Sequence, residues 1–286
     1  MVEVYNTIAG LRQVLKQRRQ QGASVSFVPT MGFLHDGHLS LMRLARERGD
    51  VLVASIFVNP TQFAPGEDLE AYPRDLERDL ALCQSVGVDI VFTPEPSQMY
   101  HPKASTTVTV AKVSQGLCGT SRPTHFQGVA TVVTKLFNIV QPDVAVFGQK
   151  DYQQLAVIRR MVRDLDIPVE IVGGAIVREA DGLAMSSRNV YLSETHRAQA
   201  TALVGALRST SAQVDGGQRS AEALLEHARG FIGRHAPAGR IDYVELVDPL
   251  ELTPVVGDMG HGGAVMALAV FFGQTRLIDN MHLGAP

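Results

Sequence analysis

Cysteine is scarce in this chain, and its two cysteines indicate neither a disulfide framework nor a metal site. Cys83 and Cys118 are the only cysteines among 286 residues. Two thiols in a chain of this length do not form a disulfide scaffold, and their spacing matches no zinc-binding pattern. Cys83 lies in an apolar stretch with helical spacing, so we interpret it as a small buried hydrophobic residue.

Long apolar runs and a strong excess of charge are also missing. No stretch is apolar for long enough to span a bilayer, and the first ten residues lack the basic and apolar segments of a secretion signal. We therefore expect a cytoplasmic protein with no membrane partner. The net charge of −3 argues against a nucleic-acid partner, which usually requires a basic surface. A small anionic ligand held by a few cations is compatible with this charge.

The first part of the chain alternates between strand-like and helix-like segments. Apolar runs of strand length occupy 25–29, 51–58, 88–92, 144–147 and 169–172, and helix-like stretches occupy 39–48, 75–86, 128–140 and 152–165. The run 51–58 is apolar except for Ser55, as in a strand buried on both faces. Such alternation predicts crossover units and a parallel sheet covered by helices. We expect an α/β domain over residues 1–176.

The pattern changes after about residue 177. Two amphipathic helical stretches, 193–207 and 221–235, are separated by a polar turn at 213–219, and three β-like runs follow them at 241–247, 264–272 and 275–280. Helices followed by consecutive strands are typical of an α+β arrangement. We therefore expect a second, smaller α+β domain over residues 177–286.

The strongest functional signal is the segment PTMGFLHDGH at 29–38, which follows a strand and opens a helix. Open parallel sheets bind ligands beyond the carboxyl ends of their strands, where helix N-termini present backbone N–H groups. His35 and His38 would share one helix face, and each can donate a hydrogen bond to a phosphate oxygen. The alternative is that the two histidines cap the helix or bind a metal. Zinc is disfavoured because no third ligand stands out at a recognisable spacing.

A second glycine turn, FGQKDYQQ at 147–154, also follows an apolar strand and opens a helix. Lys150 is a compact cation suited to a phosphate, and Gln154 can orient a polar ligand group one helical turn later. The alternative is a plain glycine turn with Asp151 as the N-cap and a solvated lysine. Both glycine turns fall at the same end of the predicted sheet, which favours a function.

Three further polar segments are weaker signals when each is taken alone. Ser186 and Arg188 lie in the segment MSSRN, which can hold a triphosphate or form an ordinary polar turn. Asn59 and Gln62 are amides at the carboxyl end of a strand, able to bind hydroxyl or carboxylate groups or to face solvent in a proline turn. Arg122 can neutralise an anionic group or remain solvated.

Together these segments closely resemble the pantothenate synthetase (pantoate–β-alanine ligase) family of the HxGH nucleotidyltransferase-like superfamily. The resemblance covers nearly the whole chain and is carried, in this order, by PTMGFLHDGH (29–38), SIFVNPTQF (55–63), AYPR (71–74), RPTHFQGV (122–129), VFGQKDYQQL (146–155) and READGLAMSSRN (178–189). It implies a Rossmann-like, doubly wound N-terminal domain, a lid-like C-terminal domain and a homodimer.

The resemblance also implies a reaction in two steps. Pantoate attacks the α-phosphorus of ATP to give pantoyl-adenylate and pyrophosphate, and β-alanine then displaces AMP to give pantothenate. Negative charge develops on the phosphates, so catalysis is mainly positioning plus preorganised positive charge. Mg²⁺ would be held mainly through the ATP phosphates, with no protein ligand implied. The polar segment 62–72 is our candidate gate over the water-sensitive adenylate.

Roles for individual residues follow from the matched positions. His38, His35 and Lys150 are the implied catalytic residues. The implied ATP site comprises Met31, Gly32, Phe33, Leu34, His35, Asp36, Gly37, His38, Gly148, Gln149, Lys150, Asp151, Val177, Met185, Ser186, Ser187 and Arg188. Gln62 and Gln154 would bind pantoate, and Gln62 would also reach β-alanine.

Two other functions compete with this interpretation. A nucleotidylyltransferase of the same superfamily would act on a phosphorylated acceptor, which calls for more cations than the amides Asn59, Gln62 and Gln154 supply. A regulatory protein that binds nucleotide without turnover would form no AMP from pantoate and β-alanine. The presence of both histidines, the lysine and the serine loop makes the regulatory role the weaker interpretation.

Overall fold

The computed structural model describes residues 2–284, so Met1, Ala285 and Pro286 of the predicted domain ranges lie outside the described residues. The chain forms two compact units, and each is considered by itself. The first unit comprises Met1–Ala111, Arg122–Gln149 and Gln154–Ala175. The second comprises Lys112–Ser121, Lys150–Gln153 and Ile176–Pro286.

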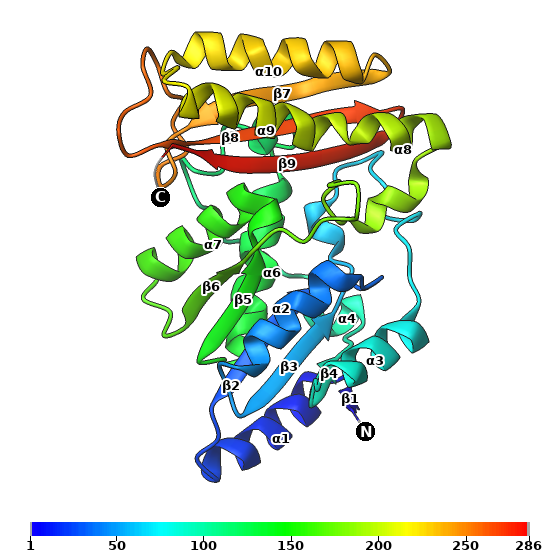
Figure 1. Cartoon of the computed structure of the whole chain (residues 1–286). Helices are drawn as coiled ribbons and strands as arrows, with labels where there is room; N and C mark the ends of the chain where they lie inside the picture. Colours follow the sequence, from blue (N-terminus) through cyan, green and yellow to red (C-terminus); the bar gives the residue numbers. More distant parts are fainter. Residues whose placement is uncertain (1, 285–286) are drawn as a thin grey trace. The chain divides into compact units, whose positions relative to one another are not determined.

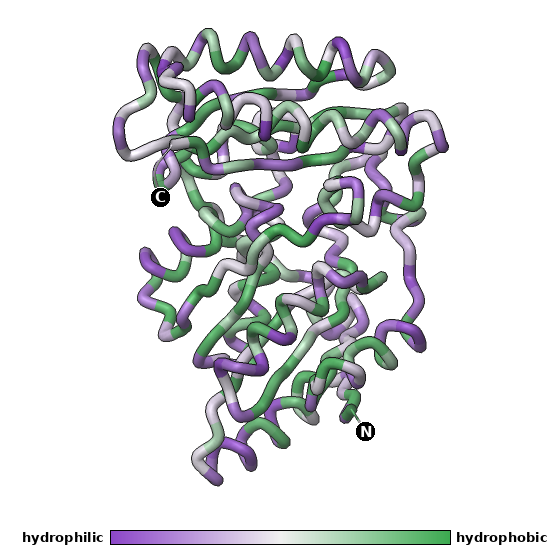
Figure 2. The backbone as a smooth tube through the Cα atoms, viewed as in Figure 1, coloured by the Kyte–Doolittle hydropathy of each residue, from purple (hydrophilic) through white to green (hydrophobic). Residues whose placement is uncertain are grey.

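A six-stranded parallel sheet forms the centre of the first unit (Figure 1). Its strands, in the spatial order β1-β4-β3-β2-β5-β6, are β1 (Glu3–Tyr5), β2 (Val25–Thr30), β3 (Val51–Ile56), β4 (Ile90–Phe92), β5 (Val144–Gly148) and β6 (Glu170–Gly174). Figure 2 shows the hydrophobic course of β3, whose first five residues are all buried. The predicted parallel sheet is confirmed.

Helices cover both faces of this sheet. α2 (Asp36–Arg46) packs on β2, β3 and β5 beside α3 (Leu76–Ser85), whereas α6 (His125–Val140) packs on β2 together with α1 (Ile8–Gln20). The short helix α4 (Pro96–Met99) follows β4, and α7 (Tyr152–Asp164) leads to β6. The face of α2 that carries Leu39, Met42 and Ala45 is buried, as its three-residue spacing requires. This is the doubly wound arrangement that the sequence predicted.

The chain order reverses at β2, which has β3 on one side and β5 on the other. All six residues of β2 pair with β3. Within the described chain, β2 pairs with β5 only at Ser26–Val144 and Phe27–Ala145, near the amino ends of both strands. The carboxyl ends of β2 and β5 therefore separate. In open parallel sheets this switch point is where ligands bind.

The second unit contains an antiparallel sheet in the order β7-β8-β9. The strands are β7 (Gly239–Val247), β8 (Ala264–Phe272) and β9 (Thr275–Leu283). The helices are α5 (Cys118–Ser121), α8 (Glu194–Ala200), α9 (Ala202–Asp215) and α10 (Ala221–His235). Side chains of α9 and α10 share one buried core with the sheet, so this unit is the smaller α+β part that the sequence predicted.

Two details differ from the sequence prediction. The predicted helix 193–207 is divided at Thr201, which ends α8 and begins α9. The predicted turn at 213–219 starts too early, because α9 continues to Asp215 and keeps Val214 buried against the core. Between residues 2 and 284, no helix is long and apolar enough to cross a membrane.

Candidate active site

The loop after β2 places the histidine motif at the switch point of the first sheet. Gly32 and Phe33 have left-handed backbone conformations, with φ of 83° and 49°. A Cβ atom on residue 32 would lie 2.9 Å from Ile56 Cγ2 and 3.0 Å from Asp79 Oδ2, so glycine is required there for space as well as conformation. The loop is thus tightly packed against β3 and α3.

Asp79 of α3 fixes the backbone of this loop. Its two carboxylate oxygens accept hydrogen bonds from the N–H groups of Phe33 and Leu34, both at 2.7 Å. The Asp79 side chain is 1% exposed. This burial is the dominant influence and raises the pKa of Asp79, against the opposing effects of the two N–H donors and Arg78. A buried carboxylate that accepts two backbone hydrogen bonds, with Arg78 at 3.9 Å, is a structural support for the loop.

The side chains of both histidines cap the N-terminus of α2. His35 is the N-cap, and its Nδ1 accepts a hydrogen bond from the N–H of Gly37 at 3.1 Å. The Nδ1 of His38 accepts a hydrogen bond from the N–H of His35 at 3.3 Å. The two ring centroids are 4.0 Å apart. Because each Nδ1 accepts, each neutral ring carries its proton on Nε2, so the capping role and a donor role use different ring nitrogens.

The amides after β3 form a connected group in η1 (Pro60–Gln62) and its N-cap. The buried Asn59 donates to Gln62 Oε1 at 3.1 Å, and Asn59 Oδ1 accepts the hydroxyl of Tyr100 at 2.7 Å. Gln62 Nε2 lies 3.1 Å from the sulfur of Met31. Gln62 is therefore oriented by Asn59 and lies beside the histidine loop.

The N-terminus of α6 packs directly on this amide group. A Cβ atom at Gly128 would lie 2.3 Å from the carbonyl oxygen of Thr61, so only glycine allows the approach. His125 Nδ1 is 2.9 Å from the Gln62 carbonyl oxygen, and Arg122 donates to the same oxygen at 3.2 Å. Arg122 also forms a bidentate pair with Glu67 at 2.6 and 2.7 Å, which ties the segment 62–72 to α6. Arg122 is therefore paired rather than solvated.

The remaining predicted residues of the first unit follow β5. Gly148 ends β5, and Gln149 begins the short helix η2 (Gln149–Asp151). Gln154 lies in the first turn of α7 and is half-buried. Within residues 2–284, no hydrogen bond of its side chain is found.

In the second unit, Lys150 is held through both its side-chain ammonium and its backbone carbonyl. Its ammonium pairs with Asp151 at 3.2 Å, and its carbonyl oxygen accepts a hydrogen bond from Asn280 of β9 at 2.9 Å. Gln153, three residues later, is buried and bonds to the backbone of Val113, Gly116 and Cys118. The turn around Lys150 is thus a fixed element of the second unit.

The serine loop belongs to the same unit. Met185 N–H bonds to the Val177 carbonyl at 3.0 Å, which joins the two ends of the loop. Ser186 caps η3 (Ser187–Tyr191) by accepting from the N–H of Arg188 at 3.2 Å, and Ser187 is buried. The structure therefore brings Val177 together with Met185, and Met31 together with Gln62, each pair within one unit.

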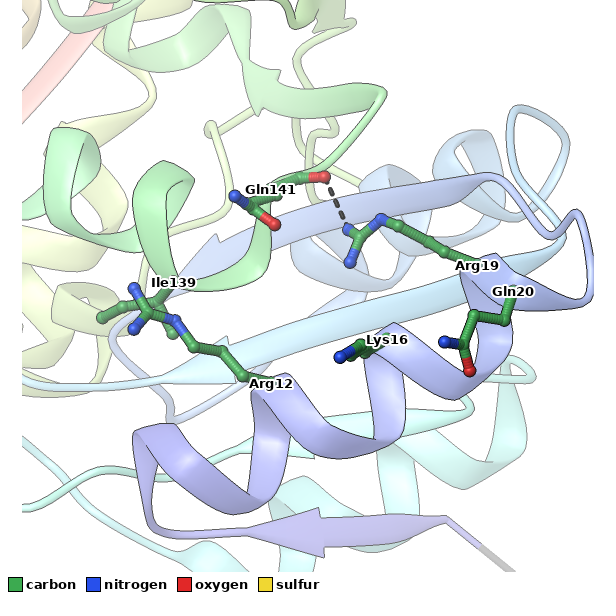
Figure 3. Close-up of a pocket in the computed structure, with 6 residues that line it drawn as sticks. All are labelled: Arg12, Lys16, Arg19, Gln20, Ile139 and Gln141. Carbon is green, nitrogen blue, oxygen red and sulfur yellow. Dashed lines mark hydrogen bonds between the residues drawn. The ribbon is translucent and has the colours of Figure 1, made fainter.

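A separate cavity of about 450 Å³ lies between α1 and the C-terminus of α6. Figure 3 shows its lining, which consists of Arg12, Lys16, Arg19, Gln20, Ile139 and Gln141. Arg12 and Arg19 donate to the last carbonyl groups of α6 and its cap. Such contacts satisfy the carbonyl end of a helix and its negative dipole. None of the predicted site residues lines this cavity.

Comparison with known proteins identifies the family. The family model described as pantoate–β-alanine ligase matches residues 3–282. The chain belongs to the pantoate–β-alanine ligase family. Pantothenate synthetase of Syntrophotalea carbinolica is 55% identical over 282 residues, which cover 99% of this chain and 99% of that protein. The enzyme of Solidesulfovibrio magneticus is 55% identical over 279 residues, which cover 98% of this chain and 97% of that protein.

Solved structures of this ligase family have the same fold. A crystal structure of pantothenate synthetase from Thermus thermophilus has a TM-score of 0.93 at 47% identity and covers 99% of this chain and 100% of that one. The Francisella tularensis pantoate–β-alanine ligase, complexed with beta-gamma ATP and β-alanine, has a TM-score of 0.81 at 31% identity. It covers 99% of this chain and 98% of that chain. The predicted family, ligase class and Rossmann-like fold are confirmed.

Proposed function

We propose that this ligase condenses pantoate with β-alanine, using ATP and passing through pantoyl-adenylate. The observation that carries the proposal is the histidine pair at the switch point of the parallel sheet. Both rings are fixed through Nδ1 by the first turn of α2. Their Nε2 donors are thereby oriented without loss of the helix cap, as preorganised stabilisation of phosphate charge requires.

The first step forms the adenylate. A pantoate carboxylate oxygen attacks the α-phosphorus, the bond to the bridging oxygen breaks, and pyrophosphate leaves. In this proposal His35 and His38 donate to phosphate oxygens, and Lys150 supplies positive charge. The loop of Ser186, Ser187 and Arg188 holds the phosphates by the hydroxyl donors and the guanidinium fork.

The remaining ATP contacts come from Met31–His38, Gly148–Asp151, Val177 and Met185, which supply backbone donors and apolar surface. Ring and amide donors next to a helix N-terminus suit an anionic ligand, because the N-terminal N–H groups carry partial positive charge. Mg²⁺ would neutralise phosphate charge when it is bound with ATP. We propose that the ATP phosphates carry the ion, and we assign no protein ligand to it.

The second step transfers the acyl group. The uncharged amine of β-alanine attacks the acyl carbon, the bond to the AMP oxygen breaks, and the amine loses a proton. Gln62 and Gln154 bind pantoate in this proposal, and Gln62 also reaches β-alanine. The support is the fixed amide of Gln62, held by Asn59 at 3.1 Å, and the unpartnered amide of Gln154. Two amides suit a neutral hydroxy group and one carboxylate.

The location and the assembly of the enzyme rest on the family resemblance. We propose a cytoplasmic homodimer, because the reaction consumes ATP and the resemblance implies two subunits. Sedimentation equilibrium tests the dimer, and a single species at the mass of one 30.9 kDa chain would reject it. The nucleotidylyltransferase alternative is not favoured, because the family match extends over residues 3–282.

Pyrophosphate exchange tests the proposed activity. The protein is incubated with ATP, Mg²⁺, labelled pyrophosphate and pantoate, but without β-alanine. We expect label to enter ATP only when pantoate is present, because the first step is reversible before the amine arrives. Addition of β-alanine should then give equal amounts of AMP and pantothenate. No pantoate-dependent exchange, or exchange that requires a phosphorylated acceptor, would reject the proposal.

A further inference from the structure

We infer that Asp279 and Asn280 of β9 are the positioning residues for nucleotide phosphate binding in the second unit. The inference rests on the proposed ATP roles of Lys150 and the loop 177–188. Neither β-strand residue belongs to the motifs from which the site was predicted. Each is bonded to one of the two phosphate-binding segments.

Asn280 holds the lysine turn. It is 6% exposed, and its Nδ2 donates to the carbonyl oxygen of Lys150 at 2.9 Å. The same turn is braced by the ring of Tyr152, whose centroid lies 5.4 Å from that of His282 in β9. These contacts fix the position of the Lys150 backbone, and the backbone position determines which points its ammonium group can reach.

Asp279 holds the serine loop. It is 3% exposed and forms a bidentate pair with Arg178, at 2.6 and 2.9 Å. Arg178 in turn donates to the carbonyl of Gly182 at 3.1 Å and bridges the backbone of Ala184. Bidentate arginine–carboxylate pairs fix geometry as well as charge. The loop is therefore held at the residue directly after Val177.

The two residues act on opposite faces of one strand. Successive side chains of a strand point to opposite faces. Leu277 and Leu283 point into the buried core of this unit, which places Asp279 on the core face and Asn280 on the other. Both are set by the regular pairing of β9 with β8, in which Asp279 faces Leu268 and Asn280 faces Ala267. A single strand, β9, thus fixes the Lys150 turn and the loop 177–188 relative to each other.

ATP affinity and steady-state kinetics of three variants test the inference. Asn280→Ala deletes the bond to Lys150, and Asp279→Asn weakens the clamp on Arg178. Asp242→Asn is the matched control, because it weakens another arginine–carboxylate pair of this sheet, in which Arg276 donates two hydrogen bonds at 2.7 and 2.9 Å. ATP binding is measured by equilibrium dialysis without pantoate. Melting temperatures report whether each variant is folded.

We expect Asn280→Ala and Asp279→Asn to raise the KM and Kd for ATP by roughly tenfold or more. The KM for pantoate should be unchanged, and Asp242→Asn should alter neither constant. In a Lys150→Ala background, Asn280→Ala should add no further loss, because it acts through that lysine. If folded Asn280→Ala binds ATP normally, or if the KM values for ATP and pantoate rise equally, the positioning role is wrong. Dialysis without pantoate separates this result from a failure of the proposed reaction.

Discussion

Replacing Asp79 with asparagine should damage the histidine loop far more than the fold. Asparagine keeps one oxygen acceptor but turns an NH₂ donor toward the second backbone N–H of the Phe33–Leu34 pair. One charge-assisted hydrogen bond is lost, and one buried donor is left unsatisfied, each worth about 1–3 kcal/mol. Burial raises the pKa of Asp79, so the neutral amide avoids part of the cost of the buried charge. We therefore expect a net loss of about 1–3 kcal/mol in the free energy of unfolding.

The effect on activity should be larger in relative terms. A loop shift of about 1 Å at a catalytic group can lower a rate by roughly 100-fold. The assays are urea unfolding and pantoate-dependent pyrophosphate exchange. Asp75→Asn is the matched control on the same helix, because Asp75 is the exposed N-cap of α3 and asparagine caps equally well. The role of Asp79 in supporting the histidine loop would be refuted by two results together. These are a normal rate of pyrophosphate exchange in folded Asp79→Asn and a free energy of unfolding changed by less than about 0.5 kcal/mol.

Three other predictions concern single side chains. His38→Ala should lower pyrophosphate exchange severely, by about 100-fold or more, while urea unfolding shows only the loss of one cap bond, about 1 kcal/mol; near-normal turnover would contradict its role. Gln62→Ala should raise the Kd for pantoate more than that for ATP, as measured by calorimetry, and equal losses would speak against a pantoate contact. Burial raises the pKa of Glu67, but Arg122, together with the Ala64 N–H and His125, outweighs burial and holds this pKa below the ordinary 4.5. The stabilisation is therefore present above pH 4.5 and is lost as pH falls through the folded value. The unfolding free energies of the wild type and Glu67→Gln should converge in acid, and a constant difference would exclude the ion pair as its source.

Much of the fold could be predicted because its signals are local. Four of the five buried positions of β3 are apolar, and Ser55 is the exception, so the burial of this strand is visible in the sequence. The first two elements were missed for a physical reason. α1 buries only Leu11 and Leu15 and is otherwise largely polar, and β1 is three residues long and is ordered by pairing with β4. Neither element has enough apolar surface of its own to be recognised.

The candidate site divides in the same way. Its motifs could be recognised because each is a short continuous segment of at most twelve residues. Asp79 was missed because its partners, Phe33 and Leu34, lie about 45 positions earlier in the chain. One signal was available: Asp79 precedes the buried Cys83 by one helical turn, so it shares the apolar face of α3. A carboxylate on such a face calls for buried donors, which only tertiary structure supplies.

The short ladder between β2 and β5 has a consequence for how the enzyme meets its ligands. Beyond Ser26–Val144 and Phe27–Ala145, each strand continues to pair with its outer neighbour, β2 with β3 and β5 with β6. A ligand can therefore bind between the carboxyl ends of β2 and β5 without breaking any hydrogen bond between these two strands. The gap is already present in the folded protein. A redesign that extended the β2–β5 pairing to the carboxyl ends of both strands would add hydrogen bonds, but it would also close this gap to ligands.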